Sequence, residues 1–200
     1  MSLPHPSTFK APFTDARLRE VAVRLLDVRY NTIRELNSPY DDNYTREGAV
    51  FGRSRNMLIE LALSKQFDWL SLCHAGMDIT CKIDDIPFRF FRDDPDSPAK
   101  AGFFKRNNFD CLFEDEENAP VMWRFVVEKA MFEEDEDRVY FVGYNVYQEK
   151  VSEWVYTGAV TKLHSVDHDI PAAADIPAPD VDVRDVPGQD DKPSKTGNDE

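Results

Sequence analysis

Three arginines near a pair of glycines form the first group of residues that could bind a ligand. Arg46 precedes residues 48–52, which begin and end with glycine, and Arg53 and Arg55 follow, where the pattern indicates that a helix begins near Ser54. The free N–H groups and the positive dipole end of a helix start favour anions. The sequence therefore predicts an anion or phosphate site at these arginines. The alternative is that they only balance acidic loops elsewhere in the chain.

Two acidic segments, one of them ending in a lysine, form the second group: Asp94-Pro95-Asp96 and Gln148-Glu149-Lys150. Carboxylates that hold Mg²⁺ beside a lysine are a common device for hydrolysing phosphodiesters. The two segments loosely resemble the signature of the PD-(D/E)xK nucleases. The resemblance fails at Gln148, where the signature has a carboxylate, and the Pro-Asp pair lies in a predicted loop. We therefore interpret both segments as solvated turns and assign no family.

Histidine, cysteine and serine form no recognisable site. His164 and His168 have the i, i+4 spacing of a metal-binding pair, but they begin a low-complexity stretch, which favours a solvated linker. Cys73 and His74 are neighbours, and side chains one residue apart on a helix diverge by about 100°. The sequence has no G-x-S-x-G segment. We predict no catalytic residue, no metal site and no cofactor.

A short basic and aromatic segment is a candidate contact for a partner. Lys100, Lys105 and Arg106 surround Phe103 and Phe104. Basic residues between aromatic rings can stack on and neutralise single-stranded nucleic acid, but acidic runs flank this cluster. We predict a partner-binding loop here, with plain packing of the two phenylalanines as the alternative.

The net charge of −14 is unevenly distributed along the chain. Residues 1–60 have a balance of +1, residues 61–162 of −8 and residues 163–200 of −7. Excess negative charge opposes contact with nucleic-acid phosphates and with anionic membranes. We therefore expect the partner to be another protein, and neither a nucleic acid nor a membrane.

Cysteine usage and the N-terminal sequence bear on the compartment. Cys73, Cys81 and Cys111 are an odd number at scattered spacing, which indicates free thiols rather than a disulfide framework. The first residues lack the basic and apolar regions of a signal peptide, and no apolar run approaches 18 residues. We expect a cytoplasmic protein.

The apolar periodicity predicts a helix over residues 14–37, a loop over 38–52 and a second helix from Ser54. Residues 69–72 either continue that second helix or form a short helix of their own. Gly76 is the expected stop, because glycine readily adopts the left-handed conformation past a helix end.

Beyond Gly76 the apolar period changes to two residues, which predicts strands. We expect a hairpin that turns at Asp84-Asp85 and a short strand over residues 109–113. Residues 121–132 could form a strand or a helix, and their β-branched and aromatic content favours a strand at the start. A second hairpin joins residues 138–147 to residues 151–160.

These elements predict an α+β fold in which two N-terminal helices pack on a mainly antiparallel sheet. Residues 1–13 are expected to form an extended lead and residues 14–163 a single domain. Residues 164–200 are rich in proline, alanine and aspartate, which predicts a disordered acidic tail.

Four acidic runs fall at predicted breaks between strands, at residues 84–85, 93–96, 114–117 and 133–137. Such runs are usually solvated turns. If they gathered at one edge of the sheet, they would imitate DNA phosphates and occupy a nucleic-acid-binding protein.

Because the sequence has no catalytic signature, we expect a non-enzymatic protein-interaction domain with an acidic surface. The first alternative is an enzyme acting on phosphate-containing substrates or nucleic acid, using Arg53, Arg55 and a carboxylate cluster. The second alternative is the acidic inhibitor that mimics nucleic acid.

Overall fold

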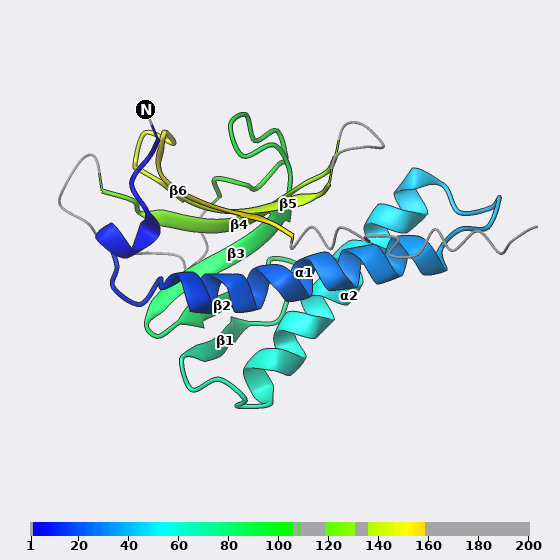
Figure 1. The fold of residues 1–200 in the computed structure, drawn as a ribbon, viewed down its shortest axis with the longest axis horizontal. Helices are drawn as coiled ribbons and strands as arrows, with labels where there is room; N and C mark the ends of the chain where they lie inside the picture. Colours follow the sequence, from blue (N-terminus) through cyan, green and yellow to red (C-terminus); the bar gives the residue numbers. More distant parts are fainter. Residues whose placement is uncertain (1, 106–107, 109–118, 131–135, 159–200) are drawn as a thin grey trace, which may run out of the picture. The chain divides into compact units, whose positions relative to one another are not determined.

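The computed structural model describes residues 2–105, 108, 119–130 and 136–158. Within them, two helices and a six-stranded, mostly antiparallel sheet confirm the predicted α+β class (Figure 1). The helices and strands are η1 (Pro6–Thr8), α1 (Asp15–Glu35), α2 (Asn43–Leu63), β1 (Leu70–His74), β2 (Thr80–Ile83), β3 (Ile86–Arg92), β4 (Met122–Glu128), β5 (Arg138–Tyr144) and β6 (Lys150–Thr157). The predicted tail at 164–200 and the predicted strand at 109–113 lie outside the described residues.

Helix α1 forms where the periodicity predicted it. Thr14 caps its start, and the Thr14 hydroxyl accepts a hydrogen bond from the Arg17 backbone N–H at 3.4 Å. Leu18, Val21 and Leu25 are fully or almost fully buried, because they share the helix face that packs against the core.

Helix α2 begins about eleven residues earlier than the sequence predicted, so the prediction of a loop over residues 38–52 is wrong from residue 43 onward. Asp42 caps the helix by accepting a hydrogen bond from the Thr45 backbone N–H at 2.7 Å. Gly48 and Gly52 therefore lie within the helix. Each glycine costs about 1 kcal/mol relative to alanine, and the cap together with burial of Val50 offsets this cost.

Residues 70–74 form strand β1, so the helical interpretation of this segment is wrong. Helix α2 ends at Leu63, and Lys65 takes a left-handed conformation with φ of 55°. Leu70 then pairs with Ile83 and Leu72 with Cys81 across the β1–β2 ladder. Tertiary pairing has overridden local helix preference here.

The strands follow one another across the sheet in chain order, from β1 to β6. The predicted hairpins β2–β3 and β5–β6 are confirmed, and so is the strand at the start of residues 121–132. Strand β4 pairs with β3 in parallel, and every other neighbouring pair is antiparallel.

The sheet is covered on both faces, and β4 shows how. Trp123, Phe125 and Val127 belong to the cluster that includes the buried residues of α1 and α2. The alternate residues Met122 and Val126 pack in a second cluster with Phe103, from the segment between β3 and β4. Burial on both faces explains why β4 reads as a continuous apolar run rather than an alternating one.

Aromatic rings form the centre of the larger cluster. Phe13 lies 4.6 Å from Trp123 and 4.8 Å from Phe141 between ring centroids, and Trp123 stacks on Phe141 at 5.4 Å. All three side chains are fully buried. Phe13 comes from the segment predicted to be an extended lead, so that segment contributes to the core. Its Pro4 carbonyl also accepts a hydrogen bond from the Ser152 hydroxyl at 2.9 Å.

We expect Phe141→Ala to lower the free energy of unfolding by about 3–5 kcal/mol, because it leaves a cavity beside two other rings. The matched control is Val155→Ala on the neighbouring strand β6, where the side chain is 40% exposed. This control should change stability by less than about 0.5 kcal/mol. Urea unfolding of both variants measures the difference, and equal effects would contradict the assigned core.

Candidate functional site

Helices α1 and α2 form a hairpin that extends past the end of the sheet (Figure 1). We call residues 30–49 the hairpin tip. Within the tip only Thr32 is buried, whereas burial is dense on α1 before it and resumes on α2 at Val50. The tip therefore carries surface that the core does not need.

Three tyrosines stand on the hairpin tip. Tyr30 is 66% exposed, Tyr40 is 92% exposed and Tyr44 is 86% exposed. Tyrosine offers a large rigid apolar ring with one hydrogen-bonding group, and it is enriched at the energetic centres of protein interfaces. Sequence analysis missed these residues, although Tyr40 and Tyr44 stand out as bulky rings in an otherwise polar segment.

Short hydrogen bonds fix the conformation of the tip. The Asp41 carboxylate accepts from the Ser38 backbone N–H at 2.9 Å, and the Ser38 hydroxyl accepts from the Tyr40 N–H at 3.2 Å. The Arg46 guanidinium donates from Nε to the Leu36 carbonyl at 2.8 Å, which ties α2 to the end of α1. Ordering these groups in advance reduces the entropy lost when a partner binds.

A buried group of charged residues, which we call the arginine network, holds the base of the tip. Arg29 from α1 is 3% exposed and donates to both Glu47 on α2 and Asp137 beside β5. Glu47 also pairs with Arg92 at the end of β3, with Arg92 Nε 3.1 Å from its carboxylate. The network thus joins both helices to two strands.

The electrostatics of Arg29 follow from these partners. Burial alone would lower the pKa of Arg29, but hydrogen bonds and charges from Glu47 and Asp137 outweigh burial and raise the pKa above its ordinary value. The guanidinium therefore stays charged. Its removal would leave Asp137 without its guanidinium partner and Glu47 with Arg92 alone.

Of the three arginines predicted to bind an anion at a helix start, Arg46 alone lies in the first turn of α2. Arg53 and Arg55 lie within α2, because that helix begins at Asn43. Arg53 pairs with Glu35, and Arg55 donates from Nε to the Gly76 carbonyl at 2.9 Å. The three side chains therefore make contacts that join α2 to its neighbours. An anion site at them remains a prediction.

The aromatic pair predicted to contact a partner packs against the sheet. Phe103 is 1% exposed, and its ring lies 5.4 Å from that of Tyr144. Phe104 packs 5.3 Å from the same ring. Lys105 contributes its carbonyl, which accepts a hydrogen bond from Arg89 at 2.9 Å. The two phenylalanines thus pack as the alternative interpretation describes. Arg106 lies outside the described residues, and a partner contact at this segment stays a prediction.

The acidic segment 94–96 and Lys150 do come together. Lys150 Nζ donates to the carboxylates of Asp96 and Glu153, and these ion pairs tie the loop after β3 to strand β6. In the part of the chain that the structure describes, no three His, Cys, Asp or Glu side chains are grouped to hold a metal ion. The geometry therefore supports a structural role for Lys150, whose ion pairs join this loop to β6.

The described cysteines are poor nucleophiles. Burial raises the pKa of the Cys81 thiol to about 12, and burial also raises the pKa of Cys73. The thiolate is the reactive form, so both residues remain protonated at neutral pH.

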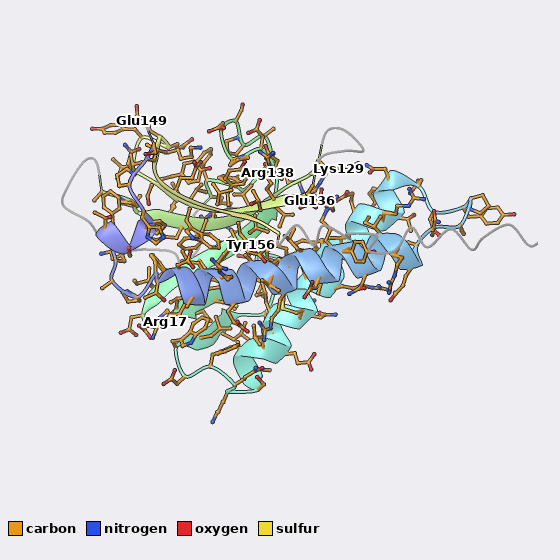
Figure 2. The ribbon with its side chains drawn as sticks, viewed as in Figure 1. Arg17, Lys129, Glu136, Arg138, Glu149 and Tyr156 are labelled. Atoms are coloured by element: carbon orange, nitrogen blue, oxygen red, sulfur yellow. The ribbon has the colours of Figure 1, made fainter. Side chains whose placement is uncertain are left out.

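The acidic runs flanking β3 lie at opposite ends of that strand, with Asp84 before it and Asp93 after it. Asp84 pairs with Arg17 (labelled in Figure 2) at 2.8 Å, and Asp93 accepts hydrogen bonds from backbone N–H groups of its own loop. These two runs therefore do not form one acidic edge. Residues 114–117 and 133–135 lie outside the described residues.

Comparison with protein-family models, with curated proteins and with solved structures finds no match to this chain. Among the described residues, no helix has the length and apolar character needed to cross a membrane. The function must therefore be inferred from the residues of the site.

We expect Arg29→Ala to lower the free energy of unfolding by about 3–5 kcal/mol, because two carboxylates lose their buried partner. The matched control is Arg19→Ala, also on α1, whose ion pair with Asp15 has side chains 58% and 57% exposed. An exposed pair contributes less than about 1 kcal/mol. Urea unfolding compares the two, and similar losses would contradict the network's role.

The Asp42 cap makes the tip sensitive to acid. The Thr45 backbone hydrogen bond is the main cause that lowers the pKa of Asp42 below its ordinary value. A lowered pKa means that the cap is intact above the unfolded value and is lost as pH falls through the folded value. We expect the Thr45 amide signal in NMR spectra to titrate with a midpoint below that of an ordinary aspartate. Asp42→Asn should abolish this titration, and an ordinary midpoint would contradict the capping role.

Proposed function

We propose that this chain is a non-enzymatic protein-interaction domain that contacts its partner through the hairpin tip. The observation that carries the proposal is the exposure of Tyr30, Tyr40 and Tyr44 on a segment that the arginine network holds in place. Exposed rings on a rigid support resemble the aromatic anchors of protein interfaces, which bury much apolar area at low entropic cost.

The charge of the tip indicates the kind of surface it fits. Residues 30–49 contain two arginines and four carboxylates, in a chain with a net charge of −14. A partner with apolar pockets rimmed by lysine or arginine would complement both the rings and the charge. Such complementarity acts mainly on the association rate and weakens at high salt.

The enzymatic alternative has less support. It used Arg53, Arg55 and a carboxylate cluster, but each of these arginines holds α2 against a neighbouring segment. The described thiols are protonated at neutral pH, and Lys150 is paired with two carboxylates. These contacts favour structural roles for the residues that an enzyme would need.

A photoreactive phenylalanine analogue placed at Tyr40 or at Tyr44 tests the proposal in the cells that naturally make the protein. We expect both positions to give a cross-linked product of the same discrete mass, because both rings face the partner. Mass spectrometry then identifies the partner, and the purified partner should bind the Tyr40→Ala/Tyr44→Ala variant at least about tenfold more weakly.

The matched control places the same analogue at Tyr147, which is 60% exposed in the turn between β5 and β6. This position should not give the product. The proposal is abandoned if Tyr147 gives the same product, if neither tip position gives one, or if the double variant binds the purified partner as well as the original protein.

A further inference from the structure

A cavity of about 180 Å³ lies beside the arginine network, between the two helices and the end of β3. Its volume exceeds the roughly 150 Å³ that suffices for benzene in an engineered protein cavity. The residues that carry the following argument are Leu25, Val50, Phe51, Phe90, Arg92 and Lys100.

One side of the cavity is apolar. The rings of Phe51 and Phe90 stack with centroids 5.5 Å apart, and Leu25, Val50 and Val127 complete this wall. A wall of aliphatic and aromatic side chains favours an apolar ligand body of similar size, because little ordered water has to be displaced.

The other side of the cavity is cationic. Arg92 and Lys100 both line it, and the same two residues line two adjoining hollows at the surface. Arg29 and Arg92 share the carboxylate of Glu47. Glu47 and Asp78 also line the cavity, so its polar side holds carboxylates as well as cations.

The pKa of Lys100 reflects its position at the cationic rim of the cavity, which Arg92 and Lys100 form. Burial of the amine lowers its pKa most, and the nearby charge of Arg92 lowers it further, while Asp93 and Glu47 act in the opposite direction. The net direction is downward because burial and the guanidinium of Arg92 together outweigh the two carboxylates. An anion bound beside the amine would favour its charged form.

The geometry points to a binding site for a small organic carboxylate with an apolar body the size of a benzene ring. The carboxylate would contact Arg92 and Lys100, and the ring would lie against Phe51 and Phe90. A guanidinium and an ammonium group are the usual ligands of a carboxylate, and charge-assisted hydrogen bonds are the stronger kind. The lining of this cavity includes no tyrosine of the hairpin tip, although Tyr44 borders one of the adjoining hollows. The site adds a small ligand to the proposed protein interaction.

Benzoate is the probe that combines both features. Titration of benzoate into the full-length protein, followed by NMR, should give saturable shifts of the amide signals of Val50, Phe51 and Val127. Benzyl alcohol retains the ring without the charge, and inorganic phosphate retains charge without the ring. Each should bind at least about tenfold more weakly, because a charged hydrogen bond contributes about 1.5–3 kcal/mol and ring burial a comparable amount.

The variant Lys100→Gln tests the cationic rim without disturbing the core, because Lys100 belongs to neither of the two apolar clusters. We expect its benzoate affinity to fall about tenfold. The matched control is Lys65→Gln, at an exposed lysine just after α2, which should bind benzoate as the original protein does. An unshifted amide spectrum with benzoate at millimolar concentration overturns the inference. So does unchanged affinity in Lys100→Gln, or binding of phosphate or benzyl alcohol as tight as that of benzoate.

Discussion

One buried charge determines how the helical hairpin meets the sheet. The side chain of Arg29 extends from α1. Its two carboxylate partners are Glu47 on α2 and Asp137, the residue before β5. A guanidinium in this position requires both partners, because a buried charge that loses its counter-ion is strongly destabilising. The directional hydrogen bonds of the guanidinium therefore fix the angle between the helical hairpin and the sheet. That angle in turn sets the orientation of the hairpin tip.

Both proposed sites border this charge. Tyr30 follows Arg29 on α1, Arg29 and Glu47 line the cavity, and Tyr44 borders a hollow that adjoins it. Figure 2 labels Lys129 and Glu136, which border the open groove between the hairpin and the ends of β4 and β5. Arg29 and Glu47 line both this groove and the cavity. A ligand that drew Arg92 away from Glu47 would therefore change the ion pairs of Glu47, whose bond to Arg29 supports the hairpin tip.

The parts of the fold that the sequence predicts well are those in which local pattern and tertiary packing agree. Helix α1 has a cap and an uninterrupted apolar face, and the hairpins have alternating strands around turn residues. The sequence does not predict the start of α2, because Gly48 and Gly52 resemble loop residues. The Asp42 cap that starts the helix is easily overlooked in the sequence. The burial of Val50, which also stabilises the helix, depends on tertiary packing that the sequence does not show. Strand β1 depends on its pairing with β2, and no local pattern specifies that pairing.

The candidate site was less predictable than the fold, for a similar reason. An arginine can bind a ligand or join two segments of the chain, and the sequence does not distinguish these roles. The role depends on whether a carbonyl or carboxylate of another segment lies within reach of the guanidinium. Arg46 faces the Leu36 carbonyl and Arg53 faces Glu35, both across the turn between the helices. The tyrosines could have been flagged as bulky rings in a polar stretch, but their exposure depends on how far the hairpin extends beyond the core.

The parallel pairing of β3 with β4 gives the sheet a seam. On each side of it lie three strands that follow one another in the chain and pair antiparallel, so each half forms its own backbone ladder from consecutive residues. A break in the chain between residues 106 and 118 would cut no described strand, and the halves would still meet through this seam and through α1, which packs on β4 and β5. The domain is therefore suited to reassembly from two fragments, and the arginine network, with Arg29 and Glu47 on one fragment and Asp137 on the other, would be completed only on their reunion.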